Sequence, residues 1–552
     1  MKIGLAQLNY HIGNFPENVR SIENEIKNAK KNGADLLLFS ELTVCGYPPL
    51  DLLEQKKFIE ECNESVKKIA LLSADIGVLI GTPTINPNTT GKKLFNSACF
   101  LYQGKIVDIY HKTLLPTYDI FDEYRHFQAN SDFRLLNFKG IKIAVTICED
   151  LWFDQPVENE FASGKLYTVN PMEKLAALKP DLIVNMAASP FSFNRIETKK
   201  SIFINAARQY HLPCIYVNQV GGQTELIFEG GSLVINSKGE IVNELKYFSS
   251  DSCIIDTDSL MGDKLPPAKK IRKDPVEMIH DALTLGIKDF FIKSGFTDAV
   301  LGLSGGIDSA VTTVIATHAL GNNHVHALLL PSQYTSENSK KEAVQLCEKL
   351  GIRYHIISIQ KIFEYFRQDL KPIFKDLPED IAEENIQSRI RSIFLMAIAN
   401  KFGYILLNTS NKSEASVGYG TLYGDMAGGL SVLGDVYKTD VYRLAGLINS
   451  KEEIIPHSTI MKPPTAELKH GQKDTDSLPE YRILDKILFE YIEHKKSVGD
   501  IIDAGFDADI VMKVVKMINK NEFKRYQTPP ILRVSSKAFG PGRRIPLVAK
   551  YP

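Results

Sequence analysis

The chain has 552 residues, of which 44% are hydrophobic and 24% are charged, and its formal net charge is −1. This length exceeds what one hydrophobic core usually organises, so two or more domains are expected. The near-neutral charge gives no electrostatic footprint for nucleic acid or an anionic membrane, and no apolar run is long enough to cross a bilayer. The seven cysteines are scattered without a C-x-x-C pair, which favours a reducing cytoplasm over a disulfide framework or a structural zinc site.

The first half of the sequence alternates short apolar runs with amphipathic segments. Residues 1–8 are typical of a first strand rather than of a signal peptide. Segment 17–31 spaces its apolar positions like a surface helix, and hairpins are predicted at 99–111 and 232–241. Region 1–258 is therefore expected to form one α/β domain. Its further strands are predicted at 35–39, 76–80, 141–145, 181–185 and 213–217.

Three residues of this half follow directly after strand-like runs and offer chemistry together. They are Glu41, Lys112 and Cys148. A thiol needs a base before it attacks an amide at neutral pH, and a cation stabilises both the thiolate and the tetrahedral oxyanion. Each residue alone is a weak signal, because a cysteine at a strand end is more often core filler and a Glu with a Lys is often a plain ion pair.

The sequence around these three positions sharpens the hypothesis. The motifs are, in chain order, FSEL at 39–42, GYPP at 46–49, HKTLLP at 111–116 and ICEDLW at 147–152. Together they resemble the nitrilase (carbon–nitrogen hydrolase) superfamily, and the resemblance covers about residues 1–258. It implies an αββα sandwich in which Glu41 is the general base, Lys112 stabilises the oxyanion and Cys148 is the acylated nucleophile.

The glutaminase branch of that superfamily binds glutamine through three further positions. The resemblance implies that Tyr118, Ser189 and Arg195 take these roles in this chain. The plainer alternatives are that Tyr118 packs at the surface and that the Ser189-Pro190 pair only makes a turn.

A polar, proline-rich segment predicts a linker at 259–274, and residues 275–552 then repeat the strand–helix alternation. The strands of this second half are predicted at 299–303, 325–330, 353–358 and 404–408. Such a pattern is typical of a doubly wound parallel sheet, which binds its ligands beyond the carboxyl ends of the strands.

The segment GLSGGIDS at 302–309 joins the first of these strands to a predicted helix. Backbone N–H groups at such a turn bind anions, glycines let the backbone approach a pyrophosphate, and Asp308 is a candidate Mg²⁺ ligand. The order SGGIDS resembles the pyrophosphate loop of the ATP pyrophosphatases, which cleave ATP between the α and β phosphates and so form adenylates.

Three other readings of this segment carry less weight. It lacks the Walker pattern G-x-x-x-x-G-K-[ST]. It also fits the G-x-S-x-G nucleophile elbow of hydrolases, but the later sequence offers no well-placed histidine partner. A turn without a ligand needs neither the aspartate nor the two serines.

The pairing of the two halves is more specific than either half alone. A nitrilase-like amidase followed by an ATP pyrophosphatase domain resembles the family of glutamine-dependent NAD⁺ synthetases over nearly the whole chain. This resemblance implies conversion of deamido-NAD (nicotinic acid adenine dinucleotide) to NAD⁺, with ATP and glutamine as co-substrates and Mg²⁺ as cofactor. It also implies a homo-oligomer and an internal path for ammonia.

The same resemblance assigns the site residues of the second half. It implies ATP contacts at Gly302, Leu303, Ser304, Gly305, Gly306, Ile307, Asp308, Ser309, Thr409, Lys438 and Thr465. It implies deamido-NAD contacts at Asn385, Arg389, Glu414 and Lys524, and Mg²⁺ ligands at Asp308 and Glu414. Leu422 stands where the ammonia-using synthetases carry a lysine, so the pyridine pocket around 420–437 is not assigned.

Two other functions stay open at this point. One is an amidase or nitrilase whose second half only binds a nucleotide for regulation. The other is an amidotransferase that acts on a different adenylated substrate, as in GMP or asparagine synthesis. The sequence has neither the Met-Cys N-terminus nor the Gly-x-Cys-x-Gly elbow of the glutaminases that serve those enzymes.

Overall fold

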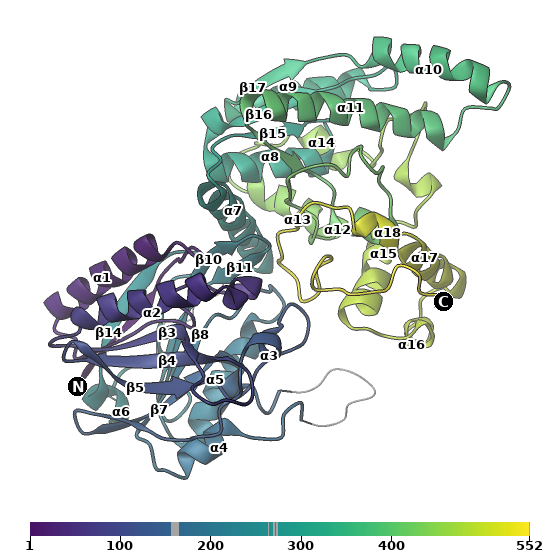
Figure 1. Cartoon of the computed structure of the whole chain (residues 1–552). Helices are drawn as coiled ribbons and strands as arrows, with labels where there is room; N and C mark the ends of the chain where they lie inside the picture. The colour runs from purple at the N-terminus through teal and green to yellow at the C-terminus, as the bar shows by residue number, and fades with distance from the viewer. Residues whose placement is uncertain (156–164, 263, 269–270, 272–273, 551–552) are drawn as a thin grey trace. The chain divides into compact units, whose positions relative to one another are not determined.

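The computed structural model divides the chain into two compact units, Met1–Arg272 and Lys273–Pro552. It describes residues 1–155, 165–262, 264–268, 271 and 274–550. Both units combine β-sheets with helices (Figure 1). Within the described residues, no helix combines the length and the apolar character that a membrane crossing requires.

Unit 1 contains two six-stranded sheets, as the predicted αββα sandwich requires. The first has the order β14-β1-β2-β3-β4-β5, and the second has the order β13-β12-β9-β8-β7-β6. The first is formed by β14 (Asp251–Asp256), β1 (Lys2–Gln7), β2 (Leu36–Leu38), β3 (Gly77–Ile85), β4 (Leu94–Tyr102) and β5 (Lys105–His111). The second is formed by β13 (Ile241–Glu244), β12 (Leu233–Ile235), β9 (Cys214–Asn218), β8 (Leu182–Ala187), β7 (Ile141–Ile147) and β6 (Leu136–Phe138).

Side-chain alternation along β2 shows how this unit is layered. Leu36 and Leu38 belong to the core between the sheets, whereas Leu37 belongs to a second core that includes Ile22 of α1 (Phe15–Lys31) and Ile69 of α2 (Lys56–Leu71). Because both faces of the strand are covered, its sequence is a continuous apolar run.

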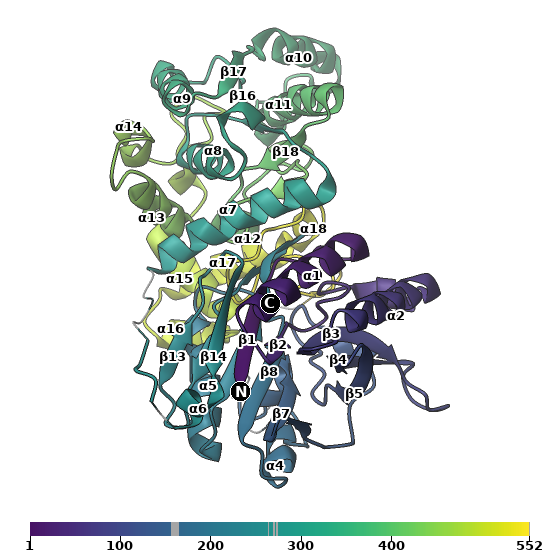
Figure 2. The same cartoon turned by 90° about the vertical axis from the view of Figure 1, so that its left-hand side faces the viewer.

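The predicted strands of this half are all present, with their end residues shifted, and both predicted hairpins form. Helix α1 begins two residues before the predicted start, because the Asn14 side chain accepts a hydrogen bond from the N–H of Glu17 and caps it. The antiparallel pairing of β1 with β14 brings a strand from the end of this unit to one edge of the first sheet (Figure 2). The short strands β10 (Val220–Gln223) and β11 (Leu226–Glu229) form a hairpin that was not predicted.

Three loops follow strands of unit 1 and carry its polar site. Glu41 comes three residues after β2, Lys112 comes directly after β5, and Cys148 comes directly after β7. Cys148 also opens a short 3-10 helix, η2 (Cys148–Leu151). The other helices of unit 1 include η1 (Leu50–Glu54), α3 (Glu123–His126), α4 (Pro171–Ala176) and α5 (Ile196–Tyr210).

The segment 259–274, expected to be a linker, is only partly irregular. Helix α6 (Thr257–Met261) extends into it, since Asp256 caps the helix and Leu260 is buried in the core of unit 1. Positions 263, 269–270 and 272–273 of this segment lie outside the described residues.

Unit 2 is built on a five-stranded sheet in which all neighbouring strands are parallel. The order β17-β16-β15-β18-β19 places the first strand of the unit in the middle, which is the doubly wound arrangement that was predicted. The strands are β15 (Ala299–Gly302), β16 (Val325–Leu329), β17 (Arg353–Ile356), β18 (Ile405–Asn408) and β19 (Leu430–Ser431). The two-residue strand β19 is too short to give a periodic signal, so it was not predicted.

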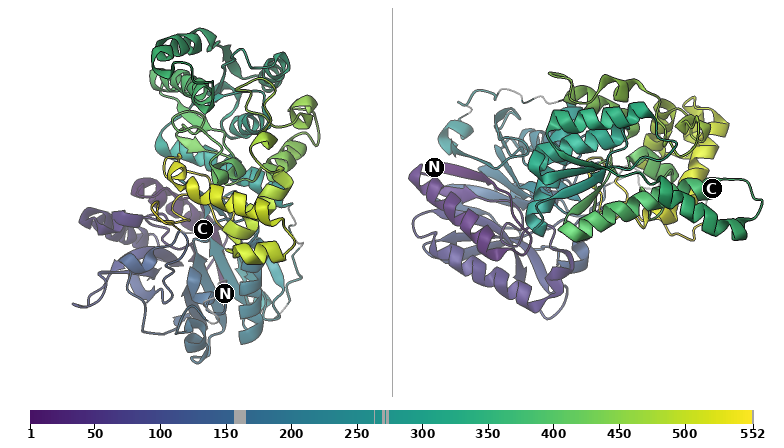
Figure 3. Two further views of the ribbon diagram at one scale, coloured as in Figure 1. Left: turned by 90° about the vertical axis from the view of Figure 1, so that its right-hand side faces the viewer. Right: turned by 90° about the horizontal axis from the view of Figure 1, so that it is seen from above.

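Helices surround this sheet, and a further group of helices forms a core of its own. Those that surround the sheet or connect its strands include α7 (Pro275–Ser294), α8 (Ile307–Leu320), α9 (Glu337–Leu350), α10 (Gln360–Phe374), α11 (Ile381–Phe402), α12 (Lys412–Val417), α13 (Lys438–Ile448) and α14 (His457–Met461). The C-terminal helices, yellow-green to yellow in Figure 3, are α15 (Tyr481–Leu488), α16 (Val498–Asp503), α17 (Ala508–Lys520) and α18 (Glu522–Arg525). Helices α15, α16 and α17 contribute to a separate apolar cluster that contains Leu484 and Val514.

Candidate active sites

A buried lysine between two carboxylates forms the centre of the polar site in unit 1. Lys112 is completely buried, and its Nζ lies 2.7 Å from Glu41 Oε1 and 2.8 Å from the carboxylate of Glu123. Glu41 also accepts hydrogen bonds from Asn96 Nδ2 at 2.7 Å and from the N–H of Ala188 at 3.1 Å. A buried ammonium needs such partners, because desolvation of an unpaired charge is very costly.

Cys148 lies in the electrostatic field of this cluster. Its backbone has a φ of 43°, in the left-handed region that non-glycine residues rarely adopt. Burial raises the pKa of the thiol well above its ordinary value, Glu41 raises it further and Lys112 opposes both. The resting thiol therefore stays protonated, and its attack on an electrophile requires transfer of that proton to a base. The structure thus brings the predicted Glu41, Lys112 and Cys148 together.

Glu123 is the residue of this site that the sequence did not reveal. It opens the short helix α3, within a polar stretch that has no periodic pattern. Its carboxylate accepts hydrogen bonds from Lys112 and, at 2.9 Å, from the hydroxyl of Tyr47. Burial raises the pKa of Glu123 to about 7, with Lys112 opposing the shift and Glu41 adding to it. Glu123 is thus able to hold a proton near neutral pH.

We expect the substitution Glu123→Gln to slow hydrolysis of a glutamine amide by about 100-fold, because the neutral amide replaces one of the two carboxylates that orient Lys112. A displaced ammonium group stabilises the oxyanion less well. Glutamate release by the purified full chain measures the effect. The matched control is Glu54→Gln, because Glu54 is exposed on η1 and bonds to Arg125. Equal rates in the two variants would contradict a role for Glu123.

The predicted glutamine contacts lie on both sides of the nucleophile in the sequence. The Tyr118 hydroxyl donates a hydrogen bond of 2.9 Å to Glu149, the residue after Cys148. Ser189 is buried, and its N–H donates to Asn218 Oδ1 at 2.9 Å. Arg195 immediately precedes helix α5. Their contacts with a ligand stay a prediction.

Glu149 is a second buried carboxylate whose role was not predicted from the sequence. Besides Tyr118, its Oε1 accepts hydrogen bonds from Gln155 Nε2 and from the Tyr167 hydroxyl, both at 2.8 Å. Burial raises the pKa of Glu149, and these three donors oppose the shift. A carboxylate next to the nucleophile is chemically suited to an ammonium group of a substrate.

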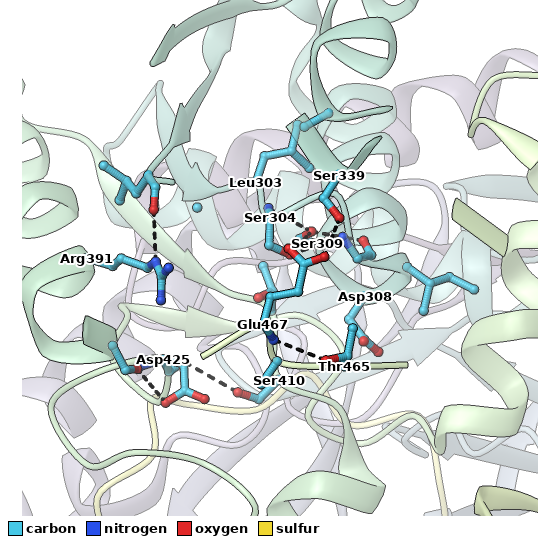
Figure 4. Close-up of a pocket in the computed structure, with 18 of the residues that line it drawn as sticks. Leu303, Ser304, Asp308, Ser309, Ser339, Arg391, Ser410, Asp425, Thr465 and Glu467 are labelled. Carbon is cyan, nitrogen blue, oxygen red and sulfur yellow. Dashed lines mark hydrogen bonds between the residues drawn. The ribbon is translucent and has the colours of Figure 1, made fainter. Parts of the chain in front are cut away.

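The second site is a cavity of about 280 Å³ in unit 2 (Figure 4). It lies where the carboxyl ends of β15, β16 and β18 meet the start of α8, the position that a doubly wound sheet predicts. The predicted residues that line it are Gly302, Leu303, Ser304, Gly306, Ile307, Asp308, Ser309, Thr409, Glu414, Lys438 and Thr465.

Gly305 is the member of the predicted loop that does not line the cavity. It has a φ of 84°, and a Cβ at this position would lie 2.3 Å from the carbonyl oxygen of Ser339. Only glycine fits this turn, since a side chain would collide with backbone as well as being strained. Gly305 therefore shapes the loop, whose Ser304 and Ser309 hydroxyls lie 3.1 Å apart (Figure 4).

Lys438, a buried cation that lines the cavity, lies among several carboxylates. Lys438 Nζ pairs with Asp308 and, at 3.2 Å, with Glu414. Burial raises the pKa of Glu414 to about 8, Lys438 opposes this shift, and Asp308 and Asp474 add to it. Asn411 Nδ2 donates to Asp308 Oδ1 at 2.9 Å. Carboxylates in such number suit a hard cation such as Mg²⁺, which prefers oxygen ligands.

The residues expected to bind deamido-NAD gather around one loop, 418–422. Asn385 accepts a 2.7 Å hydrogen bond from the Thr421 hydroxyl, and Arg389 Nε donates to the carbonyl of Leu422 at 3.2 Å. Lys524 Nζ donates to the carbonyls of Gly418 and Gly420, at 2.8 Å each. None of Asn385, Arg389 and Lys524 is among the described residues that line the cavity, whereas Glu414 is.

Arg391 is a cavity residue that was not predicted from the sequence, although it lies two positions after Arg389. Its Nε donates to the carbonyl of Leu330 at 3.0 Å (Figure 4). Burial lowers the pKa of Arg391 to about 10, and the carboxylates of Asp425 and Glu467 oppose this shift. A guanidinium at the wall of a cavity is suited to phosphate oxygens.

Comparison with known proteins shows the family to which both halves of the chain belong. The carbon–nitrogen hydrolase family model matches residues 2–263, and the NAD synthase family model matches residues 279–528. The chain is 45% identical to the glutamine-dependent NAD(+) synthetase of Synechocystis sp. over 557 residues, covering 100% of this chain and 99% of that protein. The chain belongs to the glutamine-dependent NAD(+) synthetase family.

Other members of this synthetase family are similar over the same length. The glutamine-dependent NAD(+) synthetase of Thermotoga maritima is 38% identical, with 100% of this chain and 99% of that protein covered. The structure of the glutamine-dependent NAD+ synthetase from Acinetobacter baumannii in complex with ADP matches with a TM-score of 0.78 at 37% identity, over 99% of this chain and 98% of that one. The family and the fold class predicted from the motifs are thereby confirmed.

Proposed function

We propose that this chain makes NAD⁺ from deamido-NAD in the last step of NAD⁺ biosynthesis. Ammonia from glutamine is the nitrogen source, and AMP, pyrophosphate and glutamate are the other products. The observation that carries the proposal is the union, in one chain of this family, of the Glu41–Lys112–Cys148 cluster with the cavity of the SGGIDS loop. Residues 1–258 then form the glutaminase domain, and residues 275–552 form the synthetase domain.

In the glutaminase domain, Glu41 takes the thiol proton as Cys148 Sγ attacks the amide carbon of glutamine. Lys112 stabilises the tetrahedral oxyanion, as its position between two carboxylates keeps it charged. Collapse of this intermediate breaks the carbon–nitrogen bond, and ammonia leaves with the proton that Glu41 returns. Water then hydrolyses the glutamyl thioester, releasing glutamate and the free thiol.

Recognition of glutamine follows from the charges around the nucleophile. We assign Tyr118, Ser189 and Arg195 to the amino-acid end of the substrate, with Arg195 suited to its α-carboxylate. The buried carboxylate of Glu149, which Tyr118 and Tyr167 hold in place, complements the α-ammonium group.

In the synthetase domain, the nicotinate carboxylate attacks the α-phosphorus of ATP and expels pyrophosphate, giving an acyl-adenylate. Ammonia then attacks the acyl carbon and displaces AMP, which forms the amide of NAD⁺. The N–H groups of the 304–309 turn and the start of α8 suit the phosphates, and Lys438 adds positive charge. Asp308 and Glu414 would hold Mg²⁺, whose charge neutralises phosphate oxygens when it is bound.

We further propose a homo-oligomer, for which helix α10 offers a surface. Its side chains Ile362, Tyr365, Phe366 and Ile373 are exposed although they are large and apolar. A second copy of the chain is proposed to cover this surface, and light scattering of the pure protein tests this.

A cytoplasmic location is proposed because all seven cysteines are free thiols.

The decisive experiment measures AMP release from ATP, Mg²⁺ and deamido-NAD, with either glutamine or ammonium as the nitrogen donor. We expect AMP and NAD⁺ in equal amounts with both donors, and glutamate in step with them only when glutamine is supplied. Release of glutamate without AMP would refute the synthetase reaction and leave an amidase with a nucleotide-binding domain.

A further inference from the structure

The nucleophile of unit 1 sits on a backbone that must be held in place. Cys148 has a left-handed φ of 43°, between the end of β7 and the 3-10 helix η2. This conformation is strained for a residue with a side chain, so contacts with other parts of the fold must stabilise it. The Cys148 carbonyl receives one such contact, a 3.2 Å hydrogen bond from Asn185 Nδ2 on β8.

Asp150 makes the contacts that connect this turn to the loop that follows Lys112. Its Oδ2 accepts the N–H of Ile147, the residue before the nucleophile, at 2.9 Å. Its Oδ1 accepts the N–H groups of Thr113 and Leu114, the two residues after Lys112, at 2.9 Å each. The side chain is buried. One carboxylate therefore joins the backbone on the amino side of Cys148 to the backbone on the carboxyl side of Lys112.

The number of these bonds explains why the residue is an aspartate. Three N–H donors converge on two oxygens, and an ionised carboxylate is the side chain of this length that accepts from all three without presenting a donor of its own. An asparagine has the same shape but turns an NH₂ group toward at least one N–H. The bond to Ile147 alone would be an ordinary cap of η2, whereas the bonds to Thr113 and Leu114 span 36 or more residues of sequence.

We propose that Asp150 is a positioning residue of the glutaminase reaction. Its carboxylate fixes the separation between the Lys112 ammonium and the Cys148 sulfur by tying together the two loops that carry them. This inference rests on the proposed function, in which Cys148 attacks glutamine and Lys112 receives the oxyanion. We call the three hydrogen bonds of Asp150 the bridge between the two loops. An error of about 1 Å in such a geometry costs about 100-fold in rate, so loss of the bridge lowers the rate of the chemical step more than it weakens substrate binding.

The test compares Asp150→Asn with wild type in the full chain. We expect kcat for glutamine hydrolysis to fall about 100-fold, while KM for glutamine changes by less than about threefold and ammonia-dependent NAD⁺ synthesis is unchanged. The rate at which iodoacetamide alkylates Cys148 should fall as well, with an altered pH profile. Asp154→Asn is the matched control, because Asp154 is half-exposed and pairs with Lys165.

A second variant shortens the side chain at position 150. Asp150→Ser offers one oxygen instead of two, so it cannot accept hydrogen bonds from Ile147 and from residues 113 and 114 at the same time. The bridge predicts the same loss of kcat in this variant, and a normal kcat would overturn the proposal. Loss of ammonia-dependent synthesis in both variants would overturn it too, because Asp150 would then serve folding as a whole.

The proposed function and this inference fail in different ways. If Cys148→Ala still hydrolyses glutamine, the glutaminase assignment itself is wrong. If Cys148→Ala is inactive and Asp150→Asn retains the wild-type kcat, only the positioning role is wrong.

Discussion

Replacement of Cys148 by alanine is expected to lower glutamine-dependent NAD⁺ synthesis by about 1,000-fold or more, since loss of a covalent nucleophile removes the whole hydrolytic route. Ammonia-dependent synthesis is expected to persist, because the cavity around Asp308 and Lys438 belongs to the other unit of the chain. The measurement is NAD⁺ formed per minute by the pure variant, with glutamine or with ammonium chloride as nitrogen donor.

The control for this variant is another buried cysteine of the same unit. Cys99 lies within β4, and Cys99→Ala removes a sulfur of similar burial away from the polar cluster. We expect this variant to keep both activities. If Cys148→Ala lost both activities while it remained folded by circular dichroism, the division of labour between the two units would be wrong.

Replacement of Asp308 by alanine is expected to stop AMP formation with either nitrogen source, with a loss of about 1,000-fold. Asp308 pairs with Lys438 and accepts a hydrogen bond from Asn411. Its removal leaves Lys438 with Glu414 as the remaining carboxylate partner at hydrogen-bond distance. The proposed Mg²⁺ site loses one of its two ligands at the same time. Chromatographic measurement of AMP, with glutamine and with ammonium in parallel, gives the result.

Asp440→Ala serves as the control for the Asp308 variant. Asp440 lies on the same helix as Lys438, pairs with Arg443 and does not line the cavity. Raising the Mg²⁺ concentration should partly restore the Asp308 variant if the lost group is a metal ligand. Turnover at the wild-type rate in Asp308→Ala would refute both the phosphate-site and the metal assignments.

Short-range sequence signals determined most of the strands and the functional residues that follow them. Apolar runs such as the one in segment 35–39 predicted strands, because a strand that is buried on both faces is apolar at successive positions. The SGGIDS turn was recognisable because its glycines and helix start are adjacent in sequence. Glu41, Lys112 and Cys148 were found for the same reason, since each directly follows its apolar run within a local motif.

Tertiary structure alone decided which other polar groups join these residues. Glu123 lies in a stretch without periodicity, and only packing of α3 brings its carboxylate to Lys112. Asp150 belongs to a recognised motif, but its bonds to residues 113 and 114 appear only when the two loops meet. Hydrophobic periodicity reports the local backbone and its burial, whereas the pairing of buried charges depends on which distant segments the fold brings together.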